Sequence, residues 1–415
     1  MLKRIRIEKL RLGMHIHELC GSWLEHPFWR ESFKLTERGD LARVVESGIE
    51  EAWIDTDRGL DVEVEKSTEV SERQVGSLVA HVIDKHVVTA PPTQRVSMRE
   101  ELERAARICA TSRLAVTDMF QQARMGRAID SETAAALVSE ISASVLRNPG
   151  ALISVARLKT VDDYTYMHSV AVCALMIALG RRLELPEDQV REAGLAGLLH
   201  DVGKMAIPLE ILNKPGRLTD AEFARMRDHP AEGHRMLLDG GEVSEIALDV
   251  CLHHHEKTDG SGYPHGLSGA RISLYAKMGA VCDVYDAITS DRPYKRGWDP
   301  SEALHRMTEW RAGHFDETVF VAFVGCLGIY PVGSLVRMQS SRIGVIVEQA
   351  EASLIAPTVK VFFSTRAQTR IVPEFINLAR PRPADRIACR EDPEKWGFTV
   401  LADLWKSPSV STSRV

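Results

Sequence analysis

Apolar and polar positions follow two different periods along this chain, and the changes between them divide it into regions. Residues 4–8 and 14–17 alternate with a period of two, which is typical of strands. From Met98 to about residue 330, apolar residues recur every three or four positions, which predicts helices. After Pro331 short β-like runs return. The pattern predicts a mainly α protein with a small N-terminal α+β module and a small C-terminal β appendage.

Polar stretches and turn residues predict where these regions begin and end. The N-terminal module is expected over residues 1–65, with a short helix at about 36–48. Residues 66–97 are polar, contain the run Ala90-Pro91-Pro92, and are expected to form a linker. The helical domain then covers 98–330 and the β appendage 331–380. We expect residues 381–415 to form a partly mobile tail.

Capping residues predict several helix ends within the helical domain. Asp130 can cap one helix, and Pro186 suits the first turn of another. The second of these helices ends near residue 200, where Gly203 is the expected C-cap. Thr219 and Glu222 have the spacing of a capping box.

Charge and cysteine usage restrict the class of protein. The net charge of −6 argues against duplex nucleic acid as a partner. The seven cysteines are scattered without a CxxC pair, which indicates a reducing compartment. No apolar run approaches the ~20 residues of a membrane span, and the N-terminus lacks the apolar core of a signal peptide. We therefore expect a soluble cytoplasmic protein.

The stretch HHHEKTDGSGYP at residues 253–264 suggests metal chemistry. A run of histidines can also be a solvated helix end that the helix dipole favours. Here, however, His254 follows Ile246 and Val250 on one helix face, beside a buried stripe. A second cluster, His200-Asp201, lies at a distance in the chain. Imidazole and carboxylate ligands together suit iron, manganese, zinc or nickel.

A carboxylate within an apolar helix completes the candidate ligand set. Asp283 is surrounded by apolar residues, where an unpaired charge would be costly unless it bound a cation. Five imidazoles and two carboxylates are too many for one tetrahedral zinc, so two metal ions are expected, with Asp201 spanning both. The candidate ligands are His168, His200, Asp201, His229, His254, His255 and Asp283.

Cationic residues near these ligands predict an anionic substrate. Lys204 follows Asp201 closely, and Arg292 and Lys295 follow Asp283 in the segment Ser290-Asp-Arg-Pro-Tyr-Lys295. A guanidinium offers phosphate a bidentate fork and an ammonium offers a point charge. Two metals beside such cations suit hydrolysis of a phosphate ester.

Four motifs in order resemble the HD-GYP family, a branch of the HD-domain metal phosphohydrolases. They are YTYMHS (164–169), HDVGK (200–204), DGSGYP (259–264) and DVYDAITSDRPYK (283–295), and the resemblance covers about residues 100–330. It implies an all-helical HD-type bundle that hydrolyses cyclic di-GMP through pGpG to GMP. Such an enzyme would lower second-messenger levels and so affect biofilm and motility behaviour. It would use divalent transition metals, iron or manganese before zinc or nickel.

The resemblance also assigns roles to individual residues. It implies that the seven candidates above are metal ligands and that Lys204, Tyr263, Arg292 and Lys295 contact substrate. His200, Asp201 and Lys204 would form the catalytic set. Members with a third metal carry a glutamate where this chain has Tyr164, which favours two metals. Asp286 and Glu256 are candidates for supporting the ligands or handling protons, or for structural salt bridges.

Alternative functions follow from what the motifs do not specify. The chain could hydrolyse another nucleotide, such as pGpG itself or a mixed cyclic dinucleotide. It could instead be a catalytically weak receptor or adaptor that binds the messenger or a signalling partner, although no candidate ligand is missing. The flanking modules could make the chain a homodimer or a sensor.

Overall fold

The computed structural model describes residues 2–20, 33–36, 41, 44, 51–56, 58–60, 96–157, 164–214, 216, 218–241, 243–290, 297–350 and 353–398. The chain divides into two compact units, Met1–Ser77 and Leu78–Val415. Each unit is described by itself. Most of the expected linker and most of the expected helix at 36–48 lie outside the described residues.

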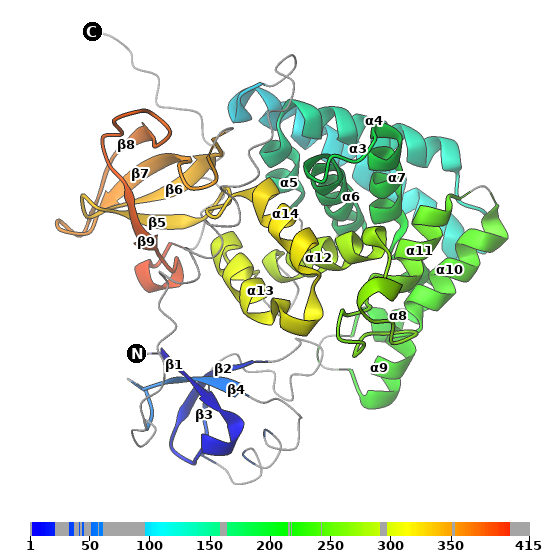
Figure 1. Cartoon of the computed structure of the whole chain (residues 1–415), viewed down its shortest axis with the longest axis horizontal. Coiled ribbons are helices and arrows are strands. Elements are labelled where there is room, and N and C mark those ends of the chain that lie inside the picture. Colours follow the sequence, from blue (N-terminus) through cyan, green and yellow to red (C-terminus); the bar gives the residue numbers. More distant parts are fainter. Residues whose placement is uncertain are drawn as a thin grey trace. The chain divides into compact units, whose positions relative to one another are not determined.

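The N-terminal unit contains a four-stranded antiparallel sheet in the order β1-β4-β2-β3 (Figure 1). Ile5, Ile16 and Ile54, which come from three different strands, lie together in a small buried cluster. This agrees with the strand prediction. The elements are β1 (Leu2–Arg6), η1 (Ile7–Lys9), β2 (His15–Cys20), β3 (Phe33–Lys34) and β4 (Glu51–Asp55).

The second unit begins with three helices whose ends follow from their capping residues. The helix α3 (Met98–Arg124) starts with a capping box in which Ser97 and Glu100 bond each other's backbone N–H groups. Asp130 caps α4 (Ser131–Arg147) as predicted. Pro149 follows the end of that helix and is also the first residue of the next one, α5 (Pro149–Arg157).

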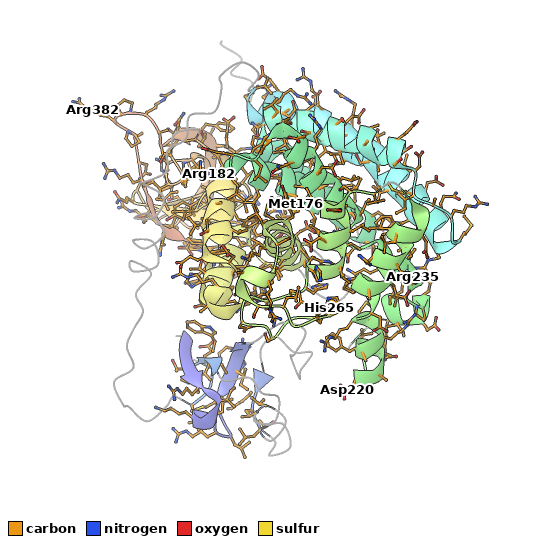
Figure 2. The ribbon with its side chains drawn as sticks, turned by 45° about the vertical axis from the view of Figure 1, so that its right-hand side comes forward. Met176, Arg182, Asp220, Arg235, His265 and Arg382 are labelled. Atoms are coloured by element: carbon orange, nitrogen blue, oxygen red, sulfur yellow. The ribbon has the colours of Figure 1, made fainter. Side chains whose placement is uncertain are left out.

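The helix α6 (Tyr164–Arg182) is the centre of the helical domain. Every residue from 167 to 180 is buried, and Met176 lies among side chains of the surrounding helices (Figure 2). A helix that is apolar on all sides can be stable only when other helices cover it. Here α7 (Glu187–Leu199), α5 and α12 (Leu274–Thr289) pack against it.

Gly203 does not serve as the predicted C-cap. The helix α7 ends at Leu199, and Gly203 lies inside the short η2 (Val202–Ala206). A Cβ at Gly203 would lie 1.9 Å from the carbonyl oxygen of His229 and 2.4 Å from the backbone nitrogen of Gly233. Glycine is therefore required here because η2 and α10 (His229–Gly240) approach each other backbone to backbone.

The remaining helices surround α6 and lead to a second sheet. The capping box of Thr219 and Glu222 begins α9 as predicted. The elements are α8 (Leu209–Leu212), α9 (Asp220–Met226), α11 (Glu245–His253), η3 (Gly269–Arg271), α13 (Pro300–His314) and α14 (Glu317–Leu327).

The C-terminal sheet has five antiparallel strands in the order β8-β7-β6-β5-β9 (Figure 1). Strand β9 lies in the stretch that we assigned to the tail. Leu335, Val345 and Phe362 on this sheet belong to the same buried cluster as Phe323 and Leu327 of α14. The elements are β5 (Leu335–Met338), β6 (Arg342–Glu348), β7 (Thr358–Ser364), β8 (Thr369–Asn377), β9 (Ile387–Arg390) and η4 (Glu394–Trp396).

The described part of the chain is thus mainly helical, with a small N-terminal strand region and a five-stranded C-terminal sheet, as predicted. Among the described helices, each is too short or too polar to cross a lipid bilayer.

Candidate metal centre

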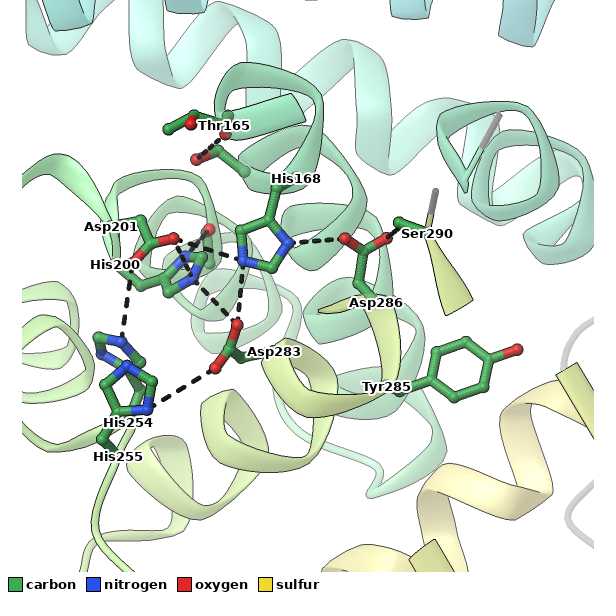
Figure 3. Close-up of polar contacts among 12 residues, drawn as sticks. Thr165, His168, His200, Asp201, His254, His255, Asp283, Tyr285, Asp286 and Ser290 are labelled. Carbon is green, nitrogen blue, oxygen red and sulfur yellow. Dashed lines mark hydrogen bonds and ion pairs between the residues drawn. The ribbon is translucent and has the colours of Figure 1, made fainter. Parts of the chain in front are cut away.

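The helical domain brings all seven predicted ligands into one buried site, and Figure 3 labels each of them except His229. They come from five places in the fold: α6, the junction of α7 and η2, the first residue of α10, the end of α11, and the middle of α12. His168, His200, Asp201, His229 and His254 are each 1% exposed. His255 and Asp283 are more accessible and mark the open side of the site.

One group of ligand atoms surrounds the Oδ2 atom of Asp201. His168 Nε2 lies 3.4 Å from this oxygen and 3.0 Å from Oδ1 of Asp283. His200 Nε2 lies 3.5 Å from Asp201 Oδ2 and 3.8 Å from Asp283 Oδ1. Ligands about 2.1 Å from one ion are roughly 3.0–3.4 Å apart, so this first cluster has the dimensions of a metal site.

A second group of ligand atoms surrounds the other oxygen of the same carboxylate. His229 Nε2 lies 3.3 Å from Asp201 Oδ1 and 3.4 Å from His254 Nε2. His254 Nε2 lies 3.9 Å from Asp201 Oδ1. One ligand atom from each of His229, His254 and His255 lies within 4.8 Å of the others. The two oxygens of Asp201 therefore face two different clusters, an arrangement in which one carboxylate can bridge two ions.

Hydrogen bonds to the backbone orient three of these imidazoles. The Nδ1 atoms of His200, His229 and His254 each bond a carbonyl three or four residues earlier, at 2.8–3.0 Å. An imidazole that donates from Nδ1 presents an unprotonated Nε2 to a metal. The Nε2 atom of His200 and Oδ1 of Asp201 are buried without a hydrogen-bond partner in the described structure. Buried nitrogen and oxygen atoms that lack a hydrogen-bond partner can serve as ligands to bound cations.

His168 is oriented by a side chain instead. Its Nδ1 lies 2.6 Å from Oδ2 of Asp286, and the other oxygen of Asp286 accepts a bond of 3.4 Å from the Ser290 hydroxyl. A carboxylate behind a ligating histidine fixes its tautomer and makes the imidazole a better ligand. The contact with His168 supports a role for Asp286 in orienting this ligand.

Changing Asp286 to asparagine should weaken metal binding without unfolding the chain. Asparagine keeps the size of the side chain but removes the charge that polarises His168, and such changes cost about 10–100-fold in metal affinity. Metal content after dialysis against a metal buffer measures the effect. Asp239, an exposed carboxylate paired with Arg235 on α10, supplies the control variant Asp239→Asn. Equal metal affinity in the two variants would contradict this role.

The ionisation states of the two carboxylates suit metal binding. Burial acts to raise the pKa of Asp201, but the Lys204 ammonium and neighbouring imidazoles outweigh it, so the pKa lies well below its usual range. Burial likewise opposes ionisation of Asp283, but hydrogen bonds from His168 and His200 hold its pKa well below the usual range. Both groups are therefore anions at neutral pH.

Two histidines of the second cluster are neutral at the same pH. Burial, with the neighbouring imidazoles His200 and His229, lowers the pKa of His254 to about 3. Burial and the adjacent His254 lower the pKa of His255 well below its usual range. Metal binding requires unprotonated imidazole, so no proton has to be removed from either ring.

Glu256 holds the loop that follows α11. It is 2% exposed, and its two carboxylate oxygens accept the backbone N–H groups of His265 at 2.8 Å and Leu267 at 2.9 Å. His265, labelled in Figure 2, is exposed. Both oxygens are thus occupied by the loop, which supports a structural role rather than proton handling.

A glutamine at position 256 should loosen this loop. Its amide has one acceptor oxygen, so one partly buried N–H would lose its partner at a cost of about 1 kcal/mol. Faster amide hydrogen exchange over residues 257–268 is the expected result, with exchange in α4 unchanged. Exchange at the rate of the original chain would show that the carboxylate does not hold the loop.

The remaining predicted site residues divide into those that the structure places and those that it does not describe. Lys204 Nζ lies 2.5 Å from Asp201 Oδ2. The ring of Tyr263 stacks on His255 with centroids 4.6 Å apart, and the guanidinium of Arg227 lies 4.6 Å from the centre of the same ring. Sequence reasoning did not include Arg227, since only its position two residues before His229 could have suggested it. Arg292 and Lys295 lie outside the described residues.

Comparison with known families identifies two regions of the chain. Residues 146–319 match a family described as "HD domain", and this range includes every element that carries a candidate ligand: α6, α7, α10, α11 and α12. Residues 2–134 match a family described as "Domain of unknown function (DUF3391)". HD-domain phosphohydrolases bind divalent metals, which agrees with the clusters of histidine and aspartate found here.

Three curated proteins are similar to this chain. "Cyclic di-GMP phosphodiesterase PA4108" of Pseudomonas aeruginosa is 56% identical over 99% of this chain and 97% of its own length. "Cyclic di-GMP phosphodiesterase response regulator RpfG" of Xanthomonas campestris is 44% identical over 33% of this chain and 37% of its own length. "3'3'-cGAMP-specific phosphodiesterase 1" of Vibrio cholerae is 36% identical over 39% of this chain and 38% of its own length.

Proposed function

The chain belongs to the HD-GYP branch of the HD-domain phosphohydrolases, and we propose that it hydrolyses cyclic di-GMP through pGpG to GMP, using two divalent transition metal ions. The relative that it matches over nearly its whole length carries the name of a cyclic di-GMP phosphodiesterase. The observation that carries the proposal is the position of Asp201, whose two oxygens face two separate ligand clusters. Such an enzyme lowers the level of the second messenger and so affects biofilm and motility behaviour.

The ligand set supports two ions rather than one. His168, His200 and Asp283 would hold the first ion, His229, His254 and His255 would hold the second, and Asp201 would join them. Mixed imidazole and carboxylate ligands suit iron or manganese, and also zinc or nickel. Tyr164, in place of the glutamate of three-metal members, supports two ions over three.

Bound ions would supply Lewis-acid charge to the phosphoryl oxygens and lower the pKa of water. The chain's own residues supply orientation and charge around the phosphate. Lys204 already neutralises Asp201 Oδ2 and is 21% exposed, so its ammonium can turn toward a phosphoryl oxygen that enters the site. Burial, with the anionic Asp283 and Asp201 nearby, raises the pKa of Tyr263 well above its usual range. Its hydroxyl therefore stays protonated and can donate a hydrogen bond.

Turnover by metal-reconstituted protein tests the proposal. We expect cyclic di-GMP to be converted to pGpG and then GMP, with chromatography of the products and measured metal content per chain. Arg292 and Lys295 are proposed to contact the phosphates in this reaction, by resemblance to the family. If protein with two bound metals per chain leaves cyclic di-GMP intact, the proposal is wrong.

A second candidate substrate follows from one of the relatives, whose name specifies 3'3'-cGAMP. Parallel assays with this mixed dinucleotide and with pGpG distinguish the substrates by their kcat/KM values. Tight binding of cyclic di-GMP without cleavage of any of the three would instead support a receptor or adaptor.

A further inference from the structure

One cation beside the candidate metal centre has no anionic partner among the described residues. Arg227 is exposed and follows the last residue of α9, two positions before His229. Its guanidinium makes no hydrogen bond or ion pair with a described carboxylate, and its contact is the cation–π interaction with the ring of Tyr263. A surface arginine usually pairs with a carboxylate, so the position of Arg227 over an aromatic ring requires an explanation.

The neighbouring Arg225 shows what the same short helix offers. Arg225 lies 3.0 Å from a carboxylate oxygen of Asp228 and 3.5 Å from one of Glu232. Two arginines on one segment thus differ in their environment, because one is neutralised by nearby acids and the other is held over an aromatic ring. Among the described residues, only Arg227 of the two lacks an acidic partner.

The contacts of Arg227 place its charge beside the second ligand cluster. The ring beneath it also stacks on His255, with 26° between the planes. The backbone next to it is fixed to the cluster as well, because Nδ1 of His229 bonds the carbonyl of Met226 at 2.8 Å. The guanidinium is therefore positioned by the same two histidines that would hold a metal ion.

A guanidinium that lies over a ring uses its face and leaves the N–H groups at its edge available. These edges can form two parallel hydrogen bonds with a phosphate. A cyclic dinucleotide has two phosphates, and the metal centre engages the one that is cleaved. A cation outside the metal ligands, such as Arg227, can bind the other phosphate.

We propose that Arg227, held over the ring of Tyr263, binds the phosphate of the dinucleotide that is not being cleaved. The inference rests on the proposed function, since it requires a substrate with two phosphates. It assigns Arg227 to substrate binding and not to metal binding or bond cleavage. In the first step the partner is the second phosphodiester of the ring, and in the second step it is the terminal phosphate of the linear dinucleotide.

Inhibition of a simpler reaction tests this inference. Bis(p-nitrophenyl) phosphate contains one phosphate, and cyclic di-GMP competes with it for the site whether or not the dinucleotide is cleaved. For Arg227→Ala we expect the inhibition constant of cyclic di-GMP to rise about tenfold, since one charged hydrogen-bonded contact is lost. The KM for bis(p-nitrophenyl) phosphate should rise much less, and metal content should stay at that of the original chain.

Two further variants make the outcome specific. Arg227→Lys, which keeps the charge but not the fork, should recover part of the affinity. Arg225→Ala removes a cation of the same helix that already has acidic partners, and the inhibition constant should not change. Equal rises in the two constants, or loss of metal from Arg227→Ala, would show that Arg227 supports the stack on His255 and would overturn the inference.

The same assay separates failure of the inference from failure of the proposed function. If cyclic di-GMP inhibits the original chain but is not cleaved, the proposed function fails and the comparison with Arg227→Ala still decides the inference. If it is cleaved and the variant has an unchanged inhibition constant, the inference fails and the function stands. If it neither inhibits nor is cleaved, both are wrong.

Discussion

Replacing Asp201 with asparagine is expected to reduce hydrolysis of cyclic di-GMP by about 1,000-fold or more, because the loss of several kcal/mol of charge stabilisation corresponds to this factor. The two oxygens of Asp201 face two ligand clusters, at 3.4 Å from His168 Nε2 and 3.3 Å from His229 Nε2. Asparagine offers one oxygen and no charge, so neither cluster keeps an anionic bridge. Steady-state rates and metal content per chain measure the two effects.

The control for this variant is again Asp239→Asn, which removes an exposed carboxylate near the opposite end of α10 from His229. It should keep the metal content and the rate of the original chain. Full activity in Asp201→Asn with two metals bound would show that this carboxylate does not bridge the clusters.

Gly203→Ala is expected to destabilise the chain more than a change to alanine at any other described glycine near the site. The new Cβ would lie 1.9 Å from the His229 carbonyl oxygen and 2.8 Å from the Gly233 Cα. Backbone atoms cannot move aside as a flexible side chain can, so η2 and α10 must separate. We expect a loss of about 3 kcal/mol or more, at the upper end of overpacking, with weaker metal binding because His229 moves.

Gly240→Ala provides a control at the end of α10, the helix that Gly203 contacts, because the nearest atoms to its added Cβ are 3.6 Å away. Alanine there should be tolerated or slightly stabilising. Thermal unfolding of both variants measures the contrast. An unchanged unfolding temperature for Gly203→Ala would mean that the two backbones are not in close contact.

The metal centre was the most predictable part of the chain, and the reason is chemical. Imidazoles and carboxylates that bind metal stand out in the sequence wherever they occur, and Asp283 stood out because of its apolar neighbours. Asp201 was expected to span both ions, but the division of the other ligands between two clusters could not be predicted. Only the fold shows that division, since it depends on how α6, α10 and α12 pack around Asp201.

The less predictable features arise from contacts between distant segments. Gly203 has the appearance of a C-cap in the sequence, but the structure requires a glycine because of a backbone 26 residues later. Glu256 looked like a possible proton carrier, whereas it bonds the loop that follows it. Strand β8 contains Pro373 and exposes most of its residues, so it lacked the alternating pattern of a half-buried strand.

The C-terminal sheet shares its apolar interior with the helices, and this has a thermodynamic consequence. Its side chains, among them Leu335 and Phe362, lie in one buried cluster with Phe323 of α14. Further links cross the same boundary, where the Met98 N–H bonds Glu348 at 2.9 Å and Arg390 pairs with Glu302. Elements joined in this way lose their order together rather than one after the other. Heat or denaturant should therefore melt sheet and helices in a single cooperative transition, and the strands cannot be regarded as an independent attachment that the rest could lose without harm.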